Sequence, residues 1–311
     1  MGSPSPKPTV KTSPETFSYQ AFGLMIESSV ACPELLPHPG RPDVYLHYGT
    51  VPDALEGGEP GEPSYEVTPD AFLLKIPGIA RYLVRGGKEI VVEPAPGAPD
   101  HEVRLFLLGS AFGALFHQRG LLSLHGCALE VDGGAVIFVG DSGTGKSTLA
   151  GALHQRGFRV ISDDVSVLSF SHEGHPMAQP SCTHVKLGAE ILLSMGKKPA
   201  AYPQVMSELA KHLVPLGEGF CAQPRQVKEI YELTTHDAQD FQIVPLQGAE
   251  KLTVLIAHTY RLAFLEGPAK RKHYFTQCGR LARQASISRL FRPPWPFGLE
   301  KLVEFLEREW T

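Results

Sequence analysis

The sequence predicts an α/β fold built around a phosphate-binding loop and preceded by a smaller, mainly β region. Residues 140–147 fit the pattern G-x-x-x-x-G-K-[ST] without a gap. An apolar run at residues 135–139 leads into this loop and a helix-forming segment follows it, which is the strand–loop–helix context of a phosphate loop. Residues 17–93 hold short apolar or alternating runs separated by Pro, Gly and Asp clusters, a pattern typical of β-strands joined by turns.

The composition divides the 311 residues into three parts. Residues 1–15 are rich in Ser, Pro, Lys and Thr, and we expect a disordered tail. Residues 16–95 are expected to form the β-rich N-terminal domain, with strands at 19–28, 43–48, 71–76, 81–84 and 89–92. The Pro- and Gly-rich segment 94–99 is expected to link it to a phosphate-loop domain at residues 100–311.

The periodicity around the loop predicts its neighbours. We expect a helix over residues 101–118 and a strand over 122–131 before the loop strand. After the loop, a helix over 147–156 stops at Gly157, a strand over 159–162 leads to Asp163 and Asp164, and residues 165–170 continue extended. Further strands are expected at 230–233 and 243–246, and further helices at 251–258, 274–285 and 299–309.

The composition also restricts location and partners. A net charge of -4 argues against a protein that coats nucleic acid. The most apolar stretch, residues 103–116, contains Arg104 and is shorter than the about 20 residues that a bilayer requires, so no membrane partner is expected. Five scattered cysteines without a C-x-x-C pair favour free thiols in a reducing compartment. With no signal-peptide core at the N-terminus, we expect a cytoplasmic protein.

Charge is unevenly distributed along the chain. Residues 43–70 contain seven carboxylates and no Lys or Arg, and residues 267–299 contain seven Lys or Arg and no carboxylate. Ordinary solvated surface is the favoured interpretation of both runs. The alternative is that the basic run binds an anionic partner such as an acidic peptide or a phosphate.

The chemistry of the loop explains its residue types. Its glycines let backbone N–H groups converge on phosphate oxygens, and the N-terminus of the following helix adds partial positive charge. Lys146 neutralises the β- and γ-phosphates, and the Ser147 hydroxyl binds Mg²⁺. The predicted nucleotide-binding residues are Gly140, Asp141, Ser142, Gly143, Thr144, Gly145, Lys146, Ser147 and Thr148.

Asp163 and Asp164 are the candidate catalytic pair. They end the strand after the loop helix, and the carboxyl end of such a strand faces the same crevice as the loop. One carboxylate would hold Mg²⁺ and the other would accept the proton of an attacking hydroxyl. The structural alternative is an Asp-Asp turn. His125 is either structural or near the γ-phosphate, and Ser142 is a candidate hydrogen-bond donor to the transferred phosphoryl group.

The order His125-Gly126, Gly140 to Ser147, then Asp163-Asp164 resembles the catalytic core of HPr serine kinase/phosphorylase. The resemblance implies a P-loop kinase core of the HPr kinase/phosphoenolpyruvate carboxykinase type that uses ATP and Mg²⁺. It implies that Asp163 is the catalytic base, that Asp164 and Ser147 lie near Mg²⁺, and that His125 and Ser142 surround the phosphoryl group.

Some positions depart from that family's pattern. Thr148 stands where the family usually has Glu, and the later glycine-rich signature is unclear. Its nearest counterpart, residues 184–190, makes Glu190 a candidate metal-associated residue. Arg225 is either a phosphate-contacting arginine or a surface arginine.

The whole-chain layout resembles the smaller HPr kinase-like proteins of lasso-peptide and related peptide-modification systems, through residues 19–24 and Arg292-Pro293. This implies a peptide or small-protein substrate with an acceptor Ser, for which the basic run at 267–299 is a candidate surface. The hexamers common among HPr kinases imply a homo-oligomer.

The leading functional hypothesis is an ATP-dependent serine kinase. One alternative is a nucleotide-binding sensor without phosphotransfer, against which the intact Asp163-Asp164 pair argues. Another is a kinase for a small hydroxylated metabolite, which keeps the chemistry and changes the acceptor.

Overall fold

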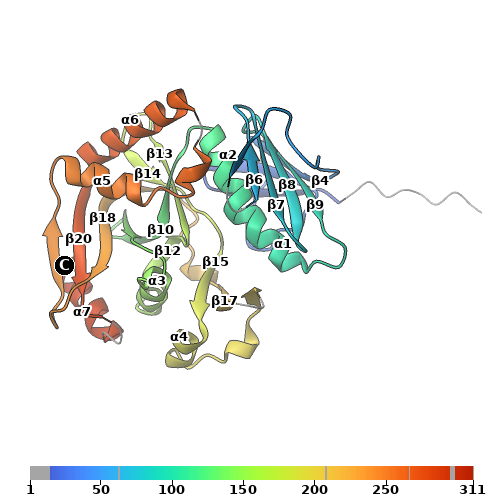
Figure 1. The fold of residues 1–311 in the computed structure, drawn as a ribbon. Helices are drawn as coiled ribbons and strands as arrows, with labels where there is room; N and C mark the ends of the chain where they lie inside the picture. Colours follow the sequence, from blue (N-terminus) through green and yellow to red (C-terminus); the bar gives the residue numbers. More distant parts are fainter. Residues whose placement is uncertain (1–14, 62–63, 207–208, 266, 295–297, 311) are drawn as a thin grey trace, which may run out of the picture.

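The computed structural model describes residues 15–61, 64–206, 209–265, 267–294 and 298–310. The predicted tail at residues 1–15 lies outside the described residues, apart from Glu15. The chain is a mixed α/β fold with a mainly β N-terminal region beside a core that carries the phosphate loop (Figure 1). All five cysteines are free thiols, as predicted.

The N-terminal region is a nine-stranded sheet of order β3-β1-β2-β4-β9-β8-β7-β6-β5. Its neighbours are antiparallel except for β2–β4 and β4–β9. The predicted strands at 43–48, 71–76, 81–84 and 89–92 are confirmed, whereas β5 and β6 were not predicted. The strands are β1 (Phe17–Ala21), β2 (Leu24–Ser28), β3 (Leu36–Pro37), β4 (Val44–Tyr48), β5 (Glu59–Gly61), β6 (Tyr65–Val67), β7 (Ala71–Ile76), β8 (Ala80–Arg85) and β9 (Glu89–Pro94).

The prediction of one strand over residues 19–28 was wrong, because a two-residue turn at Phe22 and Gly23 folds this segment into a hairpin. Both residues have positive φ, 58° and 73°, as hairpin turns of this length require. The turn contacts the core: the Phe22 N–H donates to the Pro180 carbonyl over 2.7 Å. A Cβ on Gly23 would meet the Gln179 side chain at 2.8 Å, and the positive φ of 73° also favours glycine at this position.

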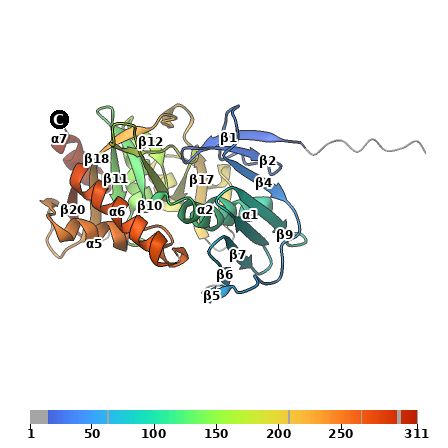
Figure 2. The same ribbon diagram turned by 90° about the horizontal axis from the view of Figure 1, so that it is seen from above.

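A helical segment joins the N-terminal sheet to the core. It consists of α1 (Asp100–Phe106), a π-helical stretch η1 (Leu107–Ala111) and α2 (Phe112–Gln118), which together occupy the predicted helix at 101–118. Its apolar side packs in one hydrophobic cluster with the N-terminal sheet, and Phe22 lies 5.3 Å and 5.0 Å from the rings of Phe112 and Phe116. Both views show α1 and α2 between the sheet and the core (Figures 1 and 2). The domain boundary at residues 95–100 stays a prediction.

The core sheet has β11, β18 and β20 parallel and adjacent, so their carboxyl ends lie at one edge. β11 is buried along its whole length, as expected of a parallel strand covered on both faces. β20 was not predicted. The strands are β10 (Leu122–Val131), β11 (Gly134–Val139), β12 (Arg159–Ser162), β13 (Val165–Phe170), β14 (Pro176–Ala178), β18 (Arg225–Thr235), β19 (Gln242–Pro245) and β20 (Ser286–Arg292).

Helices cover both faces of these strands. On one face Phe138 shares a cluster with Leu149 and Leu306, from α3 (Lys146–Gln155) and α7 (Leu299–Glu309). On the other face Ile137 shares a cluster with residues of α5 (Ala249–Ala257) and α6 (Pro268–Gln284). The helices predicted at 147–156, 251–258, 274–285 and 299–309 are confirmed, although α6 begins six residues earlier than expected. Among the described residues, no helix is long and apolar enough to cross a membrane.

A small separate sheet of order β15-β17-β16 lies below the core in Figure 1. It consists of β15 (His184–Gly188), β16 (Gln204–Met206) and β17 (Leu209–Pro215), and α4 (Ala189–Ser194) follows β15 directly. Short 3-10 turns are η2 (Pro199–Ala201), η3 (Gly217–Gly219) and η4 (Leu262–Phe264).

Candidate active site

The phosphate loop occupies the carboxyl end of β11 and leads into α3, as the sequence predicts. Gly140 has a φ of 149°, and a Cβ there would lie 2.7 Å from the Leu233 carbonyl oxygen at the end of β18. Gly143 has a φ of 86° and open space around it. Asp141, Ser142 and Gly143 are exposed, so this side of the loop can accept a ligand.

Lys146 lies buried inside the curve of the loop. Its Nζ donates to the carbonyl oxygens of Gly140 and Asp141 over 2.8 Å and 2.9 Å. Burial lowers the pKa of this ammonium below its ordinary value. The cation is thus held at the loop by weak neutral acceptors, and phosphate oxygens would satisfy it better.

Arg292 supports the loop from behind. It ends β20, is 4% exposed, and donates from its guanidinium to the Thr144 carbonyl over 2.8 Å. Thr144 in turn donates its hydroxyl to the Asp141 carbonyl over 2.9 Å. Sequence reasoning singled out Arg292 only through the Arg-Pro pair, because no local pattern shows that the end of β20 lies beside the loop.

Asp163 and Asp164 form the two-residue turn between β12 and β13. Asp164 has a φ of 71°, in the left-handed region that non-glycine residues seldom adopt, and its carbonyl accepts from the Gly126 N–H over 3.2 Å. The turn predicted as the structural alternative is therefore present. It also points both carboxyl groups toward a cavity, so the turn and the proposed chemistry are compatible.

The Asp163 carboxyl group is buried, with 9% of the residue exposed. Its Oδ2 accepts from the Lys186 N–H over 2.8 Å, whereas Oδ1 has no hydrogen-bond partner within reach among the described residues. Burial and the charge of Asp164 raise the pKa of Asp163 above its ordinary value, although the hydrogen bond and charge of Lys186 and the nearby Ser147 hydroxyl act in the opposite direction. Burying an oxygen without a hydrogen-bond partner destabilises the folded protein unless a ligand or cation binds to that oxygen.

Asp164 behaves differently because Lys186 pairs with it. Lys186 Nζ lies 2.8 Å from Asp164 Oδ2. Burial raises the pKa of Asp164, but the charge and hydrogen bond of Lys186, with His125 and Lys211, outweigh burial and lower it to about 2. The same pair raises the pKa of Lys186 despite its burial. The pKa values of the two adjacent carboxyl groups are thus shifted in opposite directions, an arrangement suited to different roles.

His125 lies on β10 beside this turn. Its Nδ1 is 3.1 Å from the Asp164 carbonyl oxygen and 3.6 Å from Oδ1 of the same residue. Burial lowers the pKa of His125, and the Asp164 charge only partly offsets this, so the imidazole is neutral at pH 7. His125 therefore lies beside the aspartate pair, and its position near the γ-phosphate stays a prediction.

Tyr260 and Arg261 complete this side of the site and were missed by sequence reasoning. The Tyr260 ring centroid lies 6.0 Å from that of His125, and the Arg261 guanidinium lies 5.6 Å from the Tyr260 ring. Arg261 is exposed and has a φ of 52°, so a strained residue holds a cation at the edge of the site.

Sequence reasoning also missed Lys186. It singled out the segment 184–190, which contains Lys186, but named only Glu190 as a candidate. The signal for Lys186 is the alternation of β15, where Val185 and Leu187 are buried in the core and Lys186 therefore faces the opposite side. Glu190 is exposed in the first turn of α4 and does not line the cavity. Thr148 is half-buried in α3.

Arg225 is not a phosphate-contacting residue. It lies at the start of β18, opposite the loop end of the sheet, and its Nε donates to Glu130 over 2.5 Å. Arg159 contacts the same carboxylate. The basic run is also dispersed: Arg280 stacks on Phe170 at 3.8 Å, and other members contact backbone carbonyls or Glu232.

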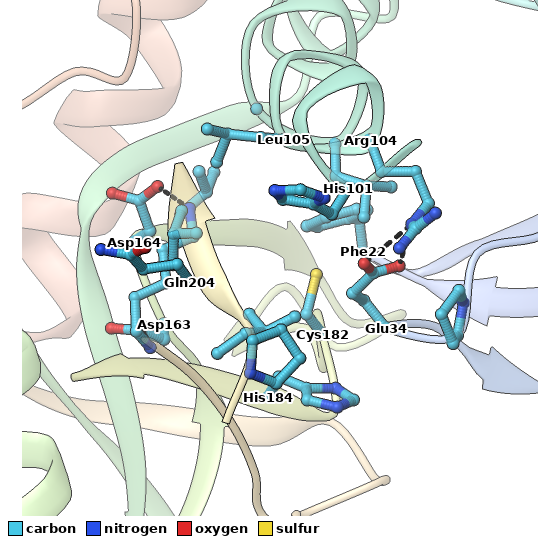
Figure 3. A pocket seen from close by; sticks show the side chains of 18 residues that line it. Phe22, Glu34, His101, Arg104, Leu105, Asp163, Asp164, Cys182, His184 and Gln204 are labelled. Atoms are coloured by element: carbon cyan, nitrogen blue, oxygen red, sulfur yellow. Dashed lines mark hydrogen bonds and ion pairs between the residues drawn. The ribbon is translucent and has the colours of Figure 1, made fainter. Parts of the chain in front are cut away.

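A cavity of about 310 Å³ is lined by both aspartates and by no residue of the phosphate loop. Figure 3 shows Asp163 and Asp164 on one side of it and the Glu34–Arg104 ion pair on the other. Its walls come from the N-terminal sheet, from α1 and η1, and from the small sheet that carries Lys186.

The chain is similar to known proteins in the following respects. Residues 120–185 match the family model of the HPr Serine kinase C-terminal domain. The HPr kinase/phosphorylase of Lactobacillus delbrueckii subsp. bulgaricus is 50% identical over 52 residues, which span 16% of this chain and 16% of that protein. The structure of the Hpr(Ser) kinase/phosphatase from Coxiella burnetii aligns with a TM-score of 0.34 and 13% identity, over 60% of this chain and 88% of that one. Residues 120–185 hold His125, the phosphate loop and both aspartates, so the segment that carries the candidate site is the segment that is similar to the HPr kinase C-terminal domain.

Proposed function

We propose that this protein is an ATP-dependent kinase that transfers the γ-phosphate to a Ser hydroxyl of a peptide or small protein. The observation that carries the proposal is the position of Asp163. Its carboxyl group lies near the Ser147 hydroxyl, at the start of the loop helix, and it is also part of the wall of the cavity. A donor phosphate bound at the loop and an acceptor in the cavity would meet at this residue.

Asp163 is suited to act as the general base. Its raised pKa makes it a stronger proton acceptor than an ordinary aspartate, and Oδ1 is free to accept a hydrogen bond from a hydroxyl group. Lys186 holds the carboxyl group through its backbone N–H and keeps Asp164 ionised through its ammonium. A sensor that only binds nucleotide has no need of a buried carboxyl group with one oxygen left open.

The residues present also fit Mg²⁺. Among the described residues, no three His, Cys, Asp or Glu side chains gather into a protein-only metal cluster. Mg²⁺ in phosphoryl-transfer sites needs only one or two protein oxygens besides phosphate and water. Ser147 and Asp164 would hold it, because the Ser147 hydroxyl lies beside the aspartate pair and Asp164 stays ionised. When bound, it would neutralise charge on the phosphate oxygens.

The proposal is tested by single-turnover transfer of labelled γ-phosphate to Ser-containing peptides. Asp163→Asn keeps the size of the side chain and an acceptor for the Lys186 N–H, but it cannot take a proton. We expect the transfer rate to fall by about 10²–10⁴-fold with ATP affinity retained, which is the range for loss of a general base. Equal rates for the variant and the wild type would show that Asp163 is not the base.

A further inference from the structure

The cavity beside Asp163 differs in chemistry from the phosphate loop. Its lining is mostly apolar and includes Leu105, Leu108, Val205 and Leu213. Leu105 and Leu213 are only half-buried and belong to none of the hydrophobic clusters of the core. The cavity therefore has apolar surface that the fold itself does not use.

Apart from Asp163, two oppositely charged pairs of the cavity wall neutralise each other. Arg104 Nε lies 2.8 Å from Glu34 Oε1, and both side chains are largely buried. Lys186 pairs with Asp164 in the same manner. Burial lowers the pKa of His184, so this wall residue is neutral at pH 7. An ionic group entering the cavity would lose its hydration without gaining a free partner.

The cavity is also the route to the candidate base. Asp163 and Asp164 are part of its wall, whereas no residue of the phosphate loop lines it. An acceptor hydroxyl reaching Asp163 from this side would carry its neighbouring atoms among the leucines. A sugar or other highly hydroxylated acceptor would find few hydrogen-bond partners there.

We propose that this cavity binds the acceptor, and that it selects a Ser whose neighbouring residue is a large aliphatic or aromatic side chain. This inference rests on the kinase function proposed above. The acceptor oxygen bonds to the γ-phosphorus of ATP, the bond from that phosphorus to the β–γ bridging oxygen breaks, ADP leaves, and the hydroxyl proton passes to Asp163. The N-terminal sheet and α1 thereby determine acceptor specificity, because they supply one wall of the cavity.

The docking of the Phe22–Gly23 turn fixes this wall. Phe22 lines the cavity and is anchored at once by its N–H bond to Pro180 and by its contacts with Phe112 and Phe116. The wall is therefore held in place relative to Asp163, and the cavity exists before an acceptor arrives.

The test uses peptides with a single Ser whose neighbours are randomised, incubated with the full chain and ATP. We expect Leu, Ile, Met and Phe beside the phosphorylated Ser to be enriched at least tenfold over Asp, Glu and Lys. Fluorescently labelled peptides that differ only in a Leu or Glu beside the Ser then measure binding to the nucleotide-free protein, where the Leu peptide should bind at least tenfold more tightly.

Leu105→Asp and Leu213→Asp place a charge in the cavity. Both should raise KM for the Leu peptide and weaken its binding at least tenfold, while affinity for a fluorescent ATP analogue stays within twofold. Leu193→Asp is the matched control, because Leu193 is 62% exposed on α4 and does not line the cavity.

The outcomes separate the two proposals. Transfer and binding that are indifferent to the neighbouring residue, or unaffected by Leu105→Asp, would overturn the acceptor cavity and leave the kinase function standing. Selective binding of the Leu peptide that Leu105→Asp abolishes, without transfer to any peptide, would support the cavity and refute the kinase function.

Discussion

The Lys186–Asp164 pair allows a quantitative test of the electrostatics of the site. Lys186→Met removes the ammonium group but keeps a side chain of similar length and the backbone N–H that binds Asp163. The pair lies at 2.8 Å with side chains 26% and 31% exposed, so solvent screens it only in part. Without Lys186, the Asp164 carboxylate remains next to Asp163 with no comparable partner, which destabilises the fold.

The magnitude follows from the pKa of Asp164. Its fall from the ordinary 3.8 to about 2 corresponds to about 2 kcal/mol of folding stability at pH 7. Because the folded-state pKa is lowered, this stability is fully present above pH 3.8 and is lost as the pH falls through about 2. The variant should therefore be less stable by about 2 kcal/mol from pH 7 to pH 5, and by about half as much at pH 3.

The assay is denaturant unfolding followed by tryptophan fluorescence at pH 7, 5 and 3. Lys228→Met is the matched control, because Lys228 is exposed at the opposite end of the sheet and donates to the neutral Asp132 carbonyl. Equal stability of the two variants at pH 7 and 5 would refute the reasoning. A loss in Lys186→Met that does not shrink at pH 3 would show that the lost stability comes from packing and not from the ion pair.

Three further predictions concern the loop and the base. Gly140→Ala places a Cβ 2.7 Å from the Leu233 carbonyl, so affinity for a fluorescent ATP analogue should fall at least tenfold, and unchanged affinity would show that the loop adjusts freely. Arg292→Met removes the charged hydrogen bond to Thr144, worth about 1.5–3 kcal/mol, so amide hydrogen exchange in the loop should accelerate; unchanged protection would contradict its supporting role. Asp163→Asn removes a carboxylate whose pKa burial raises, so the variant should be more stable than the wild type at pH 7, with the gain disappearing below the ordinary pKa of 3.8. A gain that persists at pH 3 would mean that charge is not its cause.

The local parts of the site could be predicted from the sequence because short-range physics determines them. The phosphate loop needs glycines at positive φ followed by a helix N-terminus, and eight consecutive residues are enough to indicate both. The strand–turn–strand of residues 159–170 and the helix after the loop follow from apolar periodicity in the same way. The assignment of roles to Asp163, Asp164, His125 and Ser142 remains a prediction.

Tertiary structure alone decided which distant residues join these parts. Lys186 reaches Asp164 because β15 turns its polar side toward the β12–β13 turn, and Arg292 reaches Thr144 because β11, β18 and β20 run parallel and end together. Arg225 has the same charge, but it lies at the other end of β18 and pairs with Glu130. The strand register, which no local pattern specifies, sets these distances.

The phosphate loop was therefore determined by the sequence itself, whereas the surroundings of Asp163 were not. The sequence shows two adjacent carboxyl groups. It does not show that one is buried with an oxygen that lacks a hydrogen-bond partner among the described residues, or that the other is paired with a lysine. It also does not show that the Phe22–Gly23 turn anchors the N-terminal sheet as one wall of the cavity. Burial and pairing depend on side chains brought together from across the chain, and only the folded structure fixes them.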